Sequence, residues 1–307
     1  MWAGTARRFI VARSLGVVTD PFVTHRSLLF TVAYEMLGSA VDAEDVVQET
    51  WLRWAAVDQT EVRDPRAYLV RIVTRQALNR VRTLARRRED YVGEWLPEPV
   101  LTSPDVADDV VLAESVSMAM LTVLETLEPI GRAVFVLREV FDMPYEDIAE
   151  TVDKTPAAVR QIAHRAREHV AARQPRVKVT LTEQRTAVDR FLAALDSGDI
   201  QSLLDVLAPD VVMAADGGGH VAAIREPVHG AERVAGLLST FARVSPGAEV
   251  SIMWVNGAPG MRIDLDGELD TVISLSVEDG RISRIYAVRN PEKLTLVRDE
   301  IELSRTD

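Results

Sequence analysis

Seven arginines and no acidic residue lie between Arg71 and Arg88. This arginine cluster consists of Arg71, Arg75, Arg80, Arg82, Arg86, Arg87 and Arg88. Guanidinium groups form strong, often bidentate hydrogen bonds with phosphate oxygens. Because the segment holds no acid that would neutralise it, we expect these side chains to face the phosphates of a nucleic acid, whose binding depends on local charge.

A second polar and cationic surface is expected on a helix over residues 156–170. Thr155 is of the residue type that caps helices, and Pro156 suits the first helical position. The buried side should carry Val159, Ile162, Ala163, Ala166 and Val170. The opposite side should carry Arg160, Gln161, His164, Arg165 and Arg167. Arginine and glutamine make bidentate contacts with base edges, so this helix has the composition of a DNA reader.

Residues 144–152 predict a shorter helix directly before that one. Only Asp153-Lys154-Thr155 separates the two helices. A tight turn followed by a helix that is apolar behind and polar in front is the pattern of a helix-turn-helix. Many such turns use glycine, where this chain has Asp153. An ordinary helical hairpin with a solvated cationic face is the alternative.

Acidic residues and tryptophans share another predicted helix, over residues 42–54. Its apolar side holds Val46, Val47, Thr50, Trp51 and Trp54. Its polar side holds Asp45, Gln48, Glu49 and Leu52. We expect Asp42 to cap the helix, with Asp45 completing a capping box. Tryptophan flanked by charges is typical of protein interfaces. Burial of both tryptophans in the core is the alternative, and we expect Trp51 to be the more buried.

The helix that carries the arginine cluster should begin at Asp64-Pro65, since proline suits a first turn. We expect it to bury Tyr68, Leu69, Ile72, Val73 and Leu78. Tyr68 also offers a ring on which an unstacked base can stack, and Asn79 offers amide edges for base contacts. For Tyr68 a core position is the alternative to a stacking role.

Two segments interrupt the helical pattern. The first, residues 89–113, contains Tyr91–Pro99, whose two prolines and one glycine exclude a continuous helix. A solvated linker has little use for the aromatic rings of Tyr91 and Trp95, so we expect this segment to pack against another part of the protein. A loop docked on its own domain is the alternative. The second segment covers residues 174–182.

Beyond residue 182 the pattern changes from helices alone to helices followed by strands. We expect helices near 183–197, 200–208 and 230–243, and strands over 249–256, 261–265, 269–277 and 281–289. The alternation from Thr271 to Val277 is the clearest strand signal. Helices followed by a curved antiparallel sheet indicate an α+β domain.

Composition restricts the function further. The chain has 307 residues, 47% of them hydrophobic, and no cysteine. This length suggests two or three domains. No apolar run reaches the roughly 20 residues of a membrane helix, and we see no signal peptide. Disulfides and thiolate metal sites are excluded, and the histidines have no metal-binding spacing. We expect a cytoplasmic protein without a metal, a cofactor or a membrane contact.

The net charge of −12 is unevenly distributed. Residues 183–307 hold 12 basic and 21 acidic residues, a net of −9, whereas residues 1–182 hold 23 and 26, a net of −3. The arginine cluster therefore lies in the less acidic part of the chain. Local charge governs DNA binding, so the global charge does not argue against it.

Three motifs stand in a fixed order along residues 22–173. They are the helix Asp42–Trp54, the segment from Asp64 to Arg82, and the helix-turn-helix. In this order they resemble the extracytoplasmic-function (ECF) sigma factors of bacteria. The resemblance implies a protein that binds core RNA polymerase, through its β′ and β subunits, and promoter DNA. It implies sigma region two over 20–88, which reads the −10 element, and sigma region four over 114–173, which reads the −35 element.

The same resemblance implies roles for individual residues. Binding to a basic coiled coil of β′ is implied for Asp45, Gln48, Glu49 and Leu52. Binding to promoter DNA is implied for Tyr68, Arg71, Arg75, Asn79, Arg80, Arg82, Arg86, Arg160, Gln161, His164 and Arg165.

Three short motifs are similar to those of SigJ-like sigma factors. They are Tyr91–Pro99, Asp216–Gly219 and Asn290–Leu294, the last with Glu292 where aspartate is usual. Residues 183–295 resemble a SnoaL-like domain of the NTF2-like fold. The expected architecture is thus multidomain: all-α sigma regions two and four, then an α+β cone. The resemblance implies that sigma region three is missing and that the last domain modulates activity. An interdomain, regulatory role is implied for Tyr91, Trp95, Pro97, Asp216, Gly217, Gly218, Gly219, Asn290, Pro291 and Lys293.

Two other functions stay open. The SnoaL-like fold also hosts isomerases and cyclases, which use an acidic residue as general base in an apolar pocket. The candidates for such a base are Asp210, Asp216 and His229. The third possibility is a one-component regulator that binds duplex DNA without polymerase. We expect no catalysis, and leave open a small-molecule ligand or an anti-sigma partner.

Overall fold

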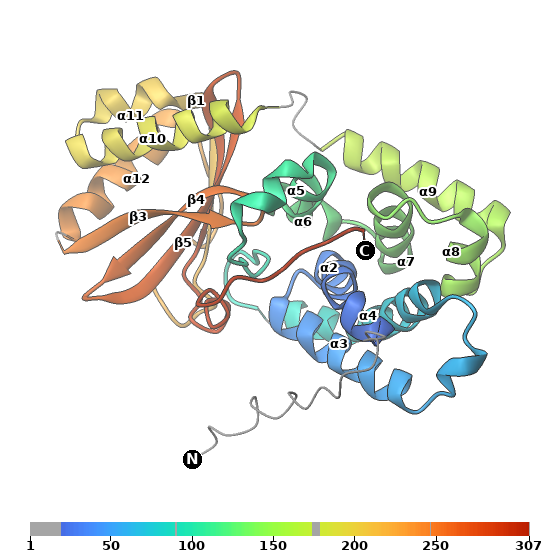
Figure 1. The fold of residues 1–307 in the computed structure, drawn as a ribbon. Coiled ribbons are helices and arrows are strands. Elements are labelled where there is room, and N and C mark those ends of the chain that lie inside the picture. Colours follow the sequence, from blue (N-terminus) through green and yellow to red (C-terminus); the bar gives the residue numbers. More distant parts are fainter. Residues whose placement is uncertain (1–19, 90, 174–178, 246, 307) are drawn as a thin grey trace, which may run out of the picture.

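The computed structural model describes residues 20–89, 91–173, 179–245 and 247–306, with backbone alone at residues 85–89 and 242 (Figure 1). Two helical blocks come first in the chain, and a sheet covered by helices follows. The first block comprises α1 (Pro21–Thr24), α2 (Arg26–Leu37), α3 (Ala40–Ala55) and α4 (Pro65–Glu89), with a 3₁₀ turn at Gln59–Glu61. The second comprises a 3₁₀ turn at Pro104–Asp108, α5 (Val110–Val116), α6 (Met118–Leu124), α7 (Pro129–Phe135), a π-helical turn at Val136–Val140, α8 (Tyr145–Val152) and α9 (Pro156–Ala171).

Helix α2 is the centre of both helical blocks. Every side chain from Leu28 to Leu37 is buried, as expected for a helix that other helices surround. It packs on α3 and α4 of its own block and on α5, α6 and α7 of the second block. One continuous apolar core therefore joins the two blocks across the segment that separates them in sequence.

The helix ends follow local capping rules, with one correction. Ser39, not Asp42, caps α3, because its hydroxyl accepts from the Asp42 backbone N–H at 3.1 Å. The prediction for Asp42 is wrong because the helix begins two residues earlier, at Ala40, so that Asp42 lies within the first turn. Thr155 caps α9 as predicted, with Pro156 in the first position. Asp153 adopts the left-handed conformation, with φ of 55°.

The C-terminal domain is a six-stranded sheet with the order β2-β1-β6-β5-β4-β3. Its helices are α10 (Leu181–Ser197), α11 (Ile200–Val206) and α12 (Ala231–Val244). Its strands are β1 (Leu207–Asp216), β2 (Val228–His229), β3 (Ala248–Val255), β4 (Ala258–Leu265), β5 (Glu268–Glu278) and β6 (Arg281–Val288). In Figure 1 the three helices cover one face of the sheet, which gives the predicted α+β cone.

Two sequence expectations for the sheet are wrong. β1 was missed, because the helix predicted near 200–208 extends past the end of α11 at Val206, and Val211–Ala215 shows no alternation of polar and apolar residues. The sheet is also mixed rather than antiparallel, since β1 pairs in parallel with β6. The predicted strands over 249–289 correspond to β3–β6, all of them paired antiparallel.

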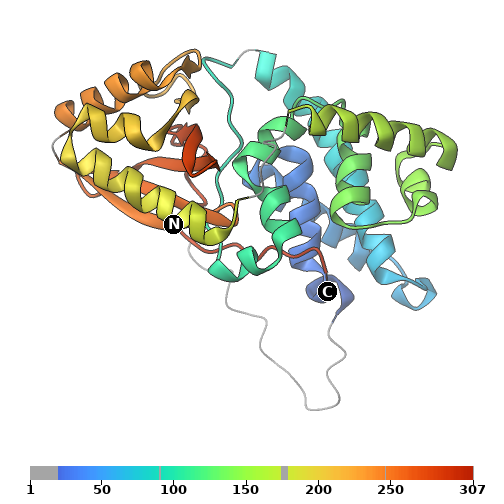
Figure 2. The same ribbon diagram turned by 90° about the horizontal axis from the view of Figure 1, so that it is seen from above.

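The two faces of the sheet have separate apolar cores. Phe191 of α10 and Ile285 of β6 belong to the core beneath the covering helices. On the other face, Tyr286 and Val288 pack with Met118 of α6 and with Leu96 of the segment 89–113, which we call the linker. Figure 2 shows the linker running between the sheet and the helical blocks. The residues described include no helix long and apolar enough to cross a membrane.

Candidate functional site

The polar side of α3 faces solvent. Gln48 and Leu52 are exposed, Leu52 by 63%. Asp45 and Glu49 lie on the same side, where Asp45 accepts from Arg80 and Glu49 accepts from Gln76 at 2.9 Å. The structure therefore brings all four predicted polymerase-binding residues onto one accessible surface.

The two tryptophans of α3 are placed the opposite way from our expectation. Trp54 is 1% exposed, and its indole N–H donates to Asp20 at 2.9 Å. Trp51 is 41% exposed and borders the polar side. The reason is helical geometry: at about 100° per residue, Thr50 and Trp54 lie within about 20° of the buried Ala43, whereas Trp51 lies about 80° away, at the edge of the buried stripe.

Three residues of the arginine cluster have partners within the protein. Arg80 donates to Asp42 at 2.7 Å and to Asp45 at 2.6 Å, which ties α4 to α3. Arg71 forms an ion pair with Glu150 of α8. Arg75 donates to the backbone carbonyl of Glu150 at 2.7 Å. The expectation that the cluster would lack acidic partners is therefore wrong, because the acids come from α3 and α8.

Other predicted DNA-binding residues of α4 lie at a cleft between this helix and the end of α8. The cleft has a volume of about 530 Å³ and is lined by Arg75, Leu78, Asn79, Arg82, Thr151, Val152 and Asp153. Asn79 and Arg82 are exposed. Tyr68 is half-buried and packs against Trp54, with ring centroids 6.0 Å apart. Arg86 belongs to α4, but its side chain is outside the described part of the chain.

The helix-turn-helix has the predicted two-sided character. Val159, Ala163, Ala166 and Val170 are buried in α9. Arg160, Gln161, His164 and Arg165 are exposed on the other side. Arg160 donates to Glu146 of α8 at 2.8 Å and lies 5.3 Å from the ring centroid of Tyr145. Arg160 thus ties the two helices together, while Gln161, His164 and Arg165 stay exposed on α9.

Asp216 joins the linker to the C-terminal domain. Its buried carboxylate accepts from the Tyr91 hydroxyl at 2.5 Å, the Leu96 backbone N–H at 2.9 Å and the Gly218 backbone N–H at 3.0 Å. The ammonium group of Lys293 donates to it at 2.7 Å. Four donors from three separate segments therefore converge on one side chain.

Lys293 completes this cluster, which we call the Asp216 cluster and define as Tyr91, Trp95, Asp216, Asn290 and Lys293. The Lys293 ammonium lies 3.3 Å from the ring centroid of Trp95 and 4.9 Å from that of Tyr91, within cation–π range. It also donates to the Leu96 carbonyl at 2.5 Å. Burial lowers the pKa of Lys293, and the Asp216 carboxylate opposes that shift.

The remaining motif residues allow the linker to approach closely. Gly218 and Gly219 both have positive φ, and a Cβ atom on Gly218 would overlap the amide of Asn290. That amide donates to the Tyr91 hydroxyl at 2.8 Å. Burial and the adjacent Asp216 carboxylate raise the pKa of Tyr91, so it keeps its proton as a donor.

Three further motif residues lie around the Asp216 cluster. A Cβ atom on Gly217 would overlap the Val221 carbonyl. Pro97 is buried, whereas Pro291 is exposed. The structure thus gathers the three short motifs in one place, with Pro291 at its surface.

Sequence reasoning missed a second junction, at Asn256 in the β3–β4 turn. This side chain is 1% exposed. Its amide group donates to the Tyr34 hydroxyl at 2.7 Å and to the Val116 carbonyl at 2.9 Å, and its oxygen accepts from Val100 at 3.3 Å. One asparagine therefore contacts α2, α5 and the linker. Asn256-Gly257 between alternating strands signals a tight hairpin, but nothing in the sequence indicated what the turn would contact.

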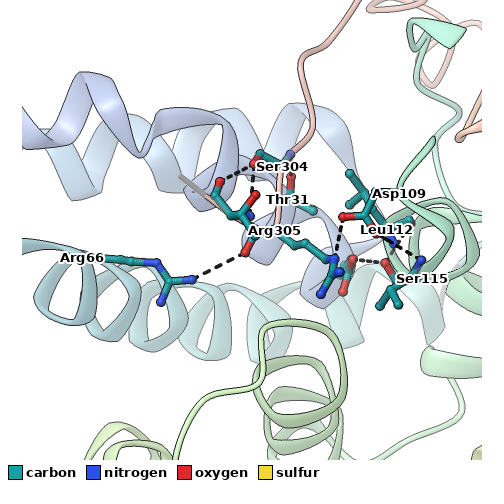
Figure 3. A network of polar contacts seen from close by, with 10 residues as sticks. Thr31, Arg66, Asp109, Leu112, Ser115, Ser304 and Arg305 are labelled. Carbon is teal, nitrogen blue, oxygen red and sulfur yellow. Dashed lines mark hydrogen bonds and ion pairs between the residues drawn. The ribbon is translucent and has the colours of Figure 1, made fainter. Parts of the chain in front are cut away.

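The C-terminal segment after β6 was also missed, because the predicted domain ended at residue 295. It returns to the helical blocks, as Figure 3 shows. The Ser304 backbone N–H donates to the Thr31 hydroxyl at 3.0 Å, and the Arg305 guanidinium donates to Asp109 at 2.6 Å. Leu303 is buried in the helical core. The segment thus ties the C-terminal domain to α2 and α5.

The three candidate general bases do not meet in a pocket. Asp210 and His229 are exposed, and the Asp216 carboxylate is occupied by the linker and Lys293. The space beneath the covering helices is filled by side chains such as Val188 and Phe191. In the described part of the chain, no group of three or more histidines and acids could hold a metal ion.

Comparison with known proteins agrees with this architecture. Residues 22–87 match the sigma-70 region 2 family, and residues 117–170 match the sigma-70 region 4 family. ECF RNA polymerase sigma factor SigJ of Mycobacterium tuberculosis is 36% identical over 288 residues, covering 89% of this chain and 92% of the relative. Probable ECF RNA polymerase sigma factor SigI of the same species is 32% identical over 92% of this chain and 97% of the relative.

The crystal structure of Mycobacterium tuberculosis SigJ is similar along the same length. It superposes with a TM-score of 0.74 at 33% identity, covering 90% of this chain and 98% of the other. The similarity thus includes the C-terminal domain as well as the two helical blocks. With sigma regions two and four in order and relatives of this identity along nearly its whole length, the chain belongs to the ECF RNA polymerase sigma factors, which direct core polymerase to promoters.

Proposed function

We propose that the C-terminal domain of this sigma factor controls transcription by holding the linker and the helical blocks in one closed arrangement. The observation that carries this proposal is the convergence of the linker, β1 and the C-terminal segment on Asp216. No catalytic step is needed for such control. The protein would act in the cytoplasm, where core polymerase and promoters are found.

The promoter-facing surfaces of α4 support a closed, inactive arrangement. Arg71 and Arg75 bind the end of α8, and Asn79 and Arg82 line the cleft between the same two helices. A melted promoter strand needs these groups, since bases are held by stacking and edge contacts and phosphates by arginines. Promoter opening would therefore require α4 and α8 to separate.

The interfaces with polymerase and duplex DNA follow from the remaining exposed surfaces. We assign binding of the β′ subunit to Asp45, Gln48, Glu49 and Leu52 of α3. We assign base reading in the −35 element to Gln161 and His164 of α9 and a phosphate contact to Arg165, because this exposed side has the polar and cationic character of a recognition helix. Contact with the β subunit would involve sigma region four.

Transcription with purified core polymerase tests the proposed control. Lys293→Met removes the charge from the Asp216 cluster, and Arg298→Met is the matched control, because Arg298 is exposed in the same segment. A coupling of about 1–3 kcal/mol corresponds to roughly a five- to 150-fold change in a binding equilibrium. We expect run-off transcription to rise several-fold in Lys293→Met and to stay unchanged in Arg298→Met. Unchanged or lower output from a folded Lys293→Met protein would contradict control by closure.

A further inference from the structure

Asn256 and Gly257 are neighbours that can react with each other. The chain has three asparagines, and Asn256 is the one that precedes a glycine. In deamidation, the Gly257 nitrogen loses its proton and attacks Cγ of Asn256, the side-chain amide leaves as ammonia, and a succinimide ring remains. Water then opens the ring to an aspartate or an isoaspartate. Glycine favours this attack because it has no Cβ atom and a wide range of backbone conformations.

The structure holds the side chain that would be attacked. Asn256 is 1% exposed. Its amide nitrogen donates to the Tyr34 hydroxyl at 2.7 Å and to the Val116 carbonyl at 2.9 Å, and its oxygen accepts from the Val100 backbone N–H at 3.3 Å. Any rotation of this side chain breaks bonds to α2, α5 or the linker, and burial keeps out the water that must open the ring.

The attacking nitrogen is held as well. The Gly257 backbone N–H donates to the Thr102 hydroxyl at 3.1 Å, and Thr102 is itself 1% exposed. A Cβ atom on Gly257 would lie 3.0 Å from the Cα atom of Ala113, so α5 packs directly on the turn. The proton that must be lost is therefore in a buried hydrogen bond, and the reaction requires the β3–β4 turn to move away from the linker and α5.

The other two asparagines serve as internal references. Asn290 precedes Pro291, which has no backbone N–H and cannot react in this way. Asn79 precedes Arg80 inside α4, where backbone N–H groups are bonded along the helix. Position 256 is therefore the one at which we expect deamidation to report on the junction.

A carboxylate at position 256 does not fit this junction. A carboxylate can only accept hydrogen bonds, and the Val116 carbonyl that faces it also only accepts. The Tyr34 hydroxyl already donates its proton to the Glu98 carbonyl at 2.6 Å. A buried charge without a partner is strongly destabilising, so the turn would not return to its place after the reaction.

We infer that Asn256 is a deamidation site, that the junction of the helical blocks with the C-terminal domain protects it, and that its modification leaves this junction open. A chain that opens repeatedly would thus become permanently open. The effect on transcription rests on the proposed function, whereas the protection and the modification do not.

Incubation of the full chain at mildly alkaline pH, without polymerase or DNA, tests the protection. Trypsin releases each asparagine in its own peptide, namely Gln76–Arg80, Val244–Arg262 and Asn290–Lys293. Digestion at mildly acidic pH adds little deamidation, and mass spectrometry then gives the modified fraction over time. Position 256 should react at least about tenfold more slowly in the folded wild type than in the urea-unfolded chain, because reaction requires local opening.

Two variants release the reacting groups separately. Thr102→Val removes the acceptor of the Gly257 N–H, and Tyr34→Phe removes one acceptor of the Asn256 amide. Each should accelerate the reaction roughly two- to tenfold, the effect of one lost hydrogen bond on the opening equilibrium. Thr50→Val is the matched control, because Thr50 is an equally buried threonine whose hydroxyl bonds within α3. It should react at the wild-type rate.

The protection is overturned if position 256 reacts as fast in the folded wild type as in urea. It is also overturned if folded Thr102→Val and Tyr34→Phe react no faster than Thr50→Val. Asn256→Asp tests the consequence, and it should unfold at lower urea concentration than the wild type and Asn79→Asp, at an exposed asparagine. Equal stability of the three proteins would overturn the claim that modification opens the junction.

Lys293→Met separates this inference from the proposed function. If the Asp216 cluster keeps the chain closed, position 256 should react faster in Lys293→Met than in Arg298→Met. Faster reaction in Thr102→Val together with an unchanged rate in Lys293→Met would support the deamidation site and contradict only the proposed closure.

Discussion

The guanidinium group of Arg75 donates to the main-chain carbonyl of Thr151 at 3.0 Å, so helix α4 of sigma region two holds the C-terminal end of α8. The last carbonyls of a helix carry partial negative charge, and a cation beside them is stabilising. The contact uses a backbone atom, and therefore depends on the position of α8 rather than on the side chain of Thr151. It links the two DNA-reading regions directly.

The first prediction is that Arg75→Met separates α4 from the helix-turn-helix formed by α8 and α9. This variant loses two bonds to α8, whereas Glu150→Gln loses only a partly exposed ion pair with Arg71. Because the natural chain has no cysteine, Thr60→Cys and Ala157→Cys can carry two dyes for energy-transfer measurements. We expect a longer distance in Arg75→Met and a smaller change in Glu150→Gln. Identical dye-to-dye distances in the wild type, Arg75→Met and Glu150→Gln would show that the Arg75 contact does not hold α4 and α8 together.

The second prediction concerns the energy of the buried pair formed by Asp216 and Lys293. Asp216→Asn leaves the Lys293 charge buried without its counter-ion, and removing one partner of such a pair costs about 3–5 kcal/mol. Lys293→Met should cost less, because three other donors still bind Asp216. The double variant should be less destabilised than the sum of the single variants, as residues in one network are not additive. Urea unfolding of the four proteins measures this, and strictly additive losses would refute the coupling.

The third prediction tests the polymerase-facing side of α3. Asp45→Lys with Glu49→Lys should weaken binding to core polymerase, because both carboxylates lie on the same accessible surface. Exposed ion pairs contribute about 0–1 kcal/mol, so the melting temperature should change little. Asp58→Lys with Glu61→Lys is the control, with two exposed acids outside α3. Pulldown with purified core polymerase measures the effect, and equal retention of both double variants would remove the assignment.

The fourth prediction separates base reading from phosphate binding in α9. Gln161→Ala should reduce discrimination at one base pair of the −35 element by about 1–3 kcal/mol. Arg165→Ala removes the proposed phosphate contact, so it should weaken all promoters alike and reduce the salt dependence by about one ion. Footprinting on promoter variants at several salt concentrations distinguishes the two. A uniform loss across promoters in Gln161→Ala would exclude base reading there.

The parts that sequence predicted correctly depend on local rules. Helix α9 and its exposed side were predicted from the capping residue Thr155 and from the spacing of Val159, Ala163 and Ala166. This succeeded because helix capping and periodicity depend on residues that are close in sequence. The alternation from Thr271 to Val277 located β5 for the same reason. The prediction that the segment with Tyr91 and Trp95 packs against another part of the protein is confirmed, but the sequence did not identify Asp216 as its partner.

The parts that sequence missed depend on contacts between distant segments. Asp42 and Arg80 lie 38 positions apart, and Arg71 and Glu150 lie 79 apart, so no local pattern predicts either pair. Asn256 contacts Tyr34 across 222 positions. β1 was missed for a different reason: its stretch Val211–Ala215 is apolar throughout and lacks the alternation that marks a strand.

The last prediction follows from Glu35, which is fully buried in α2. Burial raises the pKa of Glu35 to about 8, and the Ser115 hydroxyl and Arg132 oppose this shift only in part. Hydrogen bonding supports a protonated carboxyl group. The Ser115 hydroxyl contacts both Glu35 at 2.6 Å and the Leu112 carbonyl at 2.9 Å. It has one proton, so if it donates to Leu112, Glu35 must be the donor in the other bond.

Stability should therefore decrease as pH rises. The unfolded chain releases the Glu35 proton near its ordinary pKa of 4.5, whereas the folded protein keeps it up to about 8. Between these values the folded state binds more protons, so the free energy of unfolding falls by up to about 1.4 kcal/mol per pH unit. Glu35→Gln stays neutral, so its stability lacks the pH dependence that Glu35 causes. Glu61→Gln is the control: it removes an exposed acid and keeps the pH dependence that Glu35 causes. In urea unfolding from about pH 5 to about pH 8, the free energy of unfolding of Glu35→Gln should rise relative to that of the wild type as the pH increases. Parallel profiles for the wild type and Glu35→Gln would mean that Glu35 is already ionised in the folded protein, and that the junction of α2 with α5 and α7 does not depend on its proton.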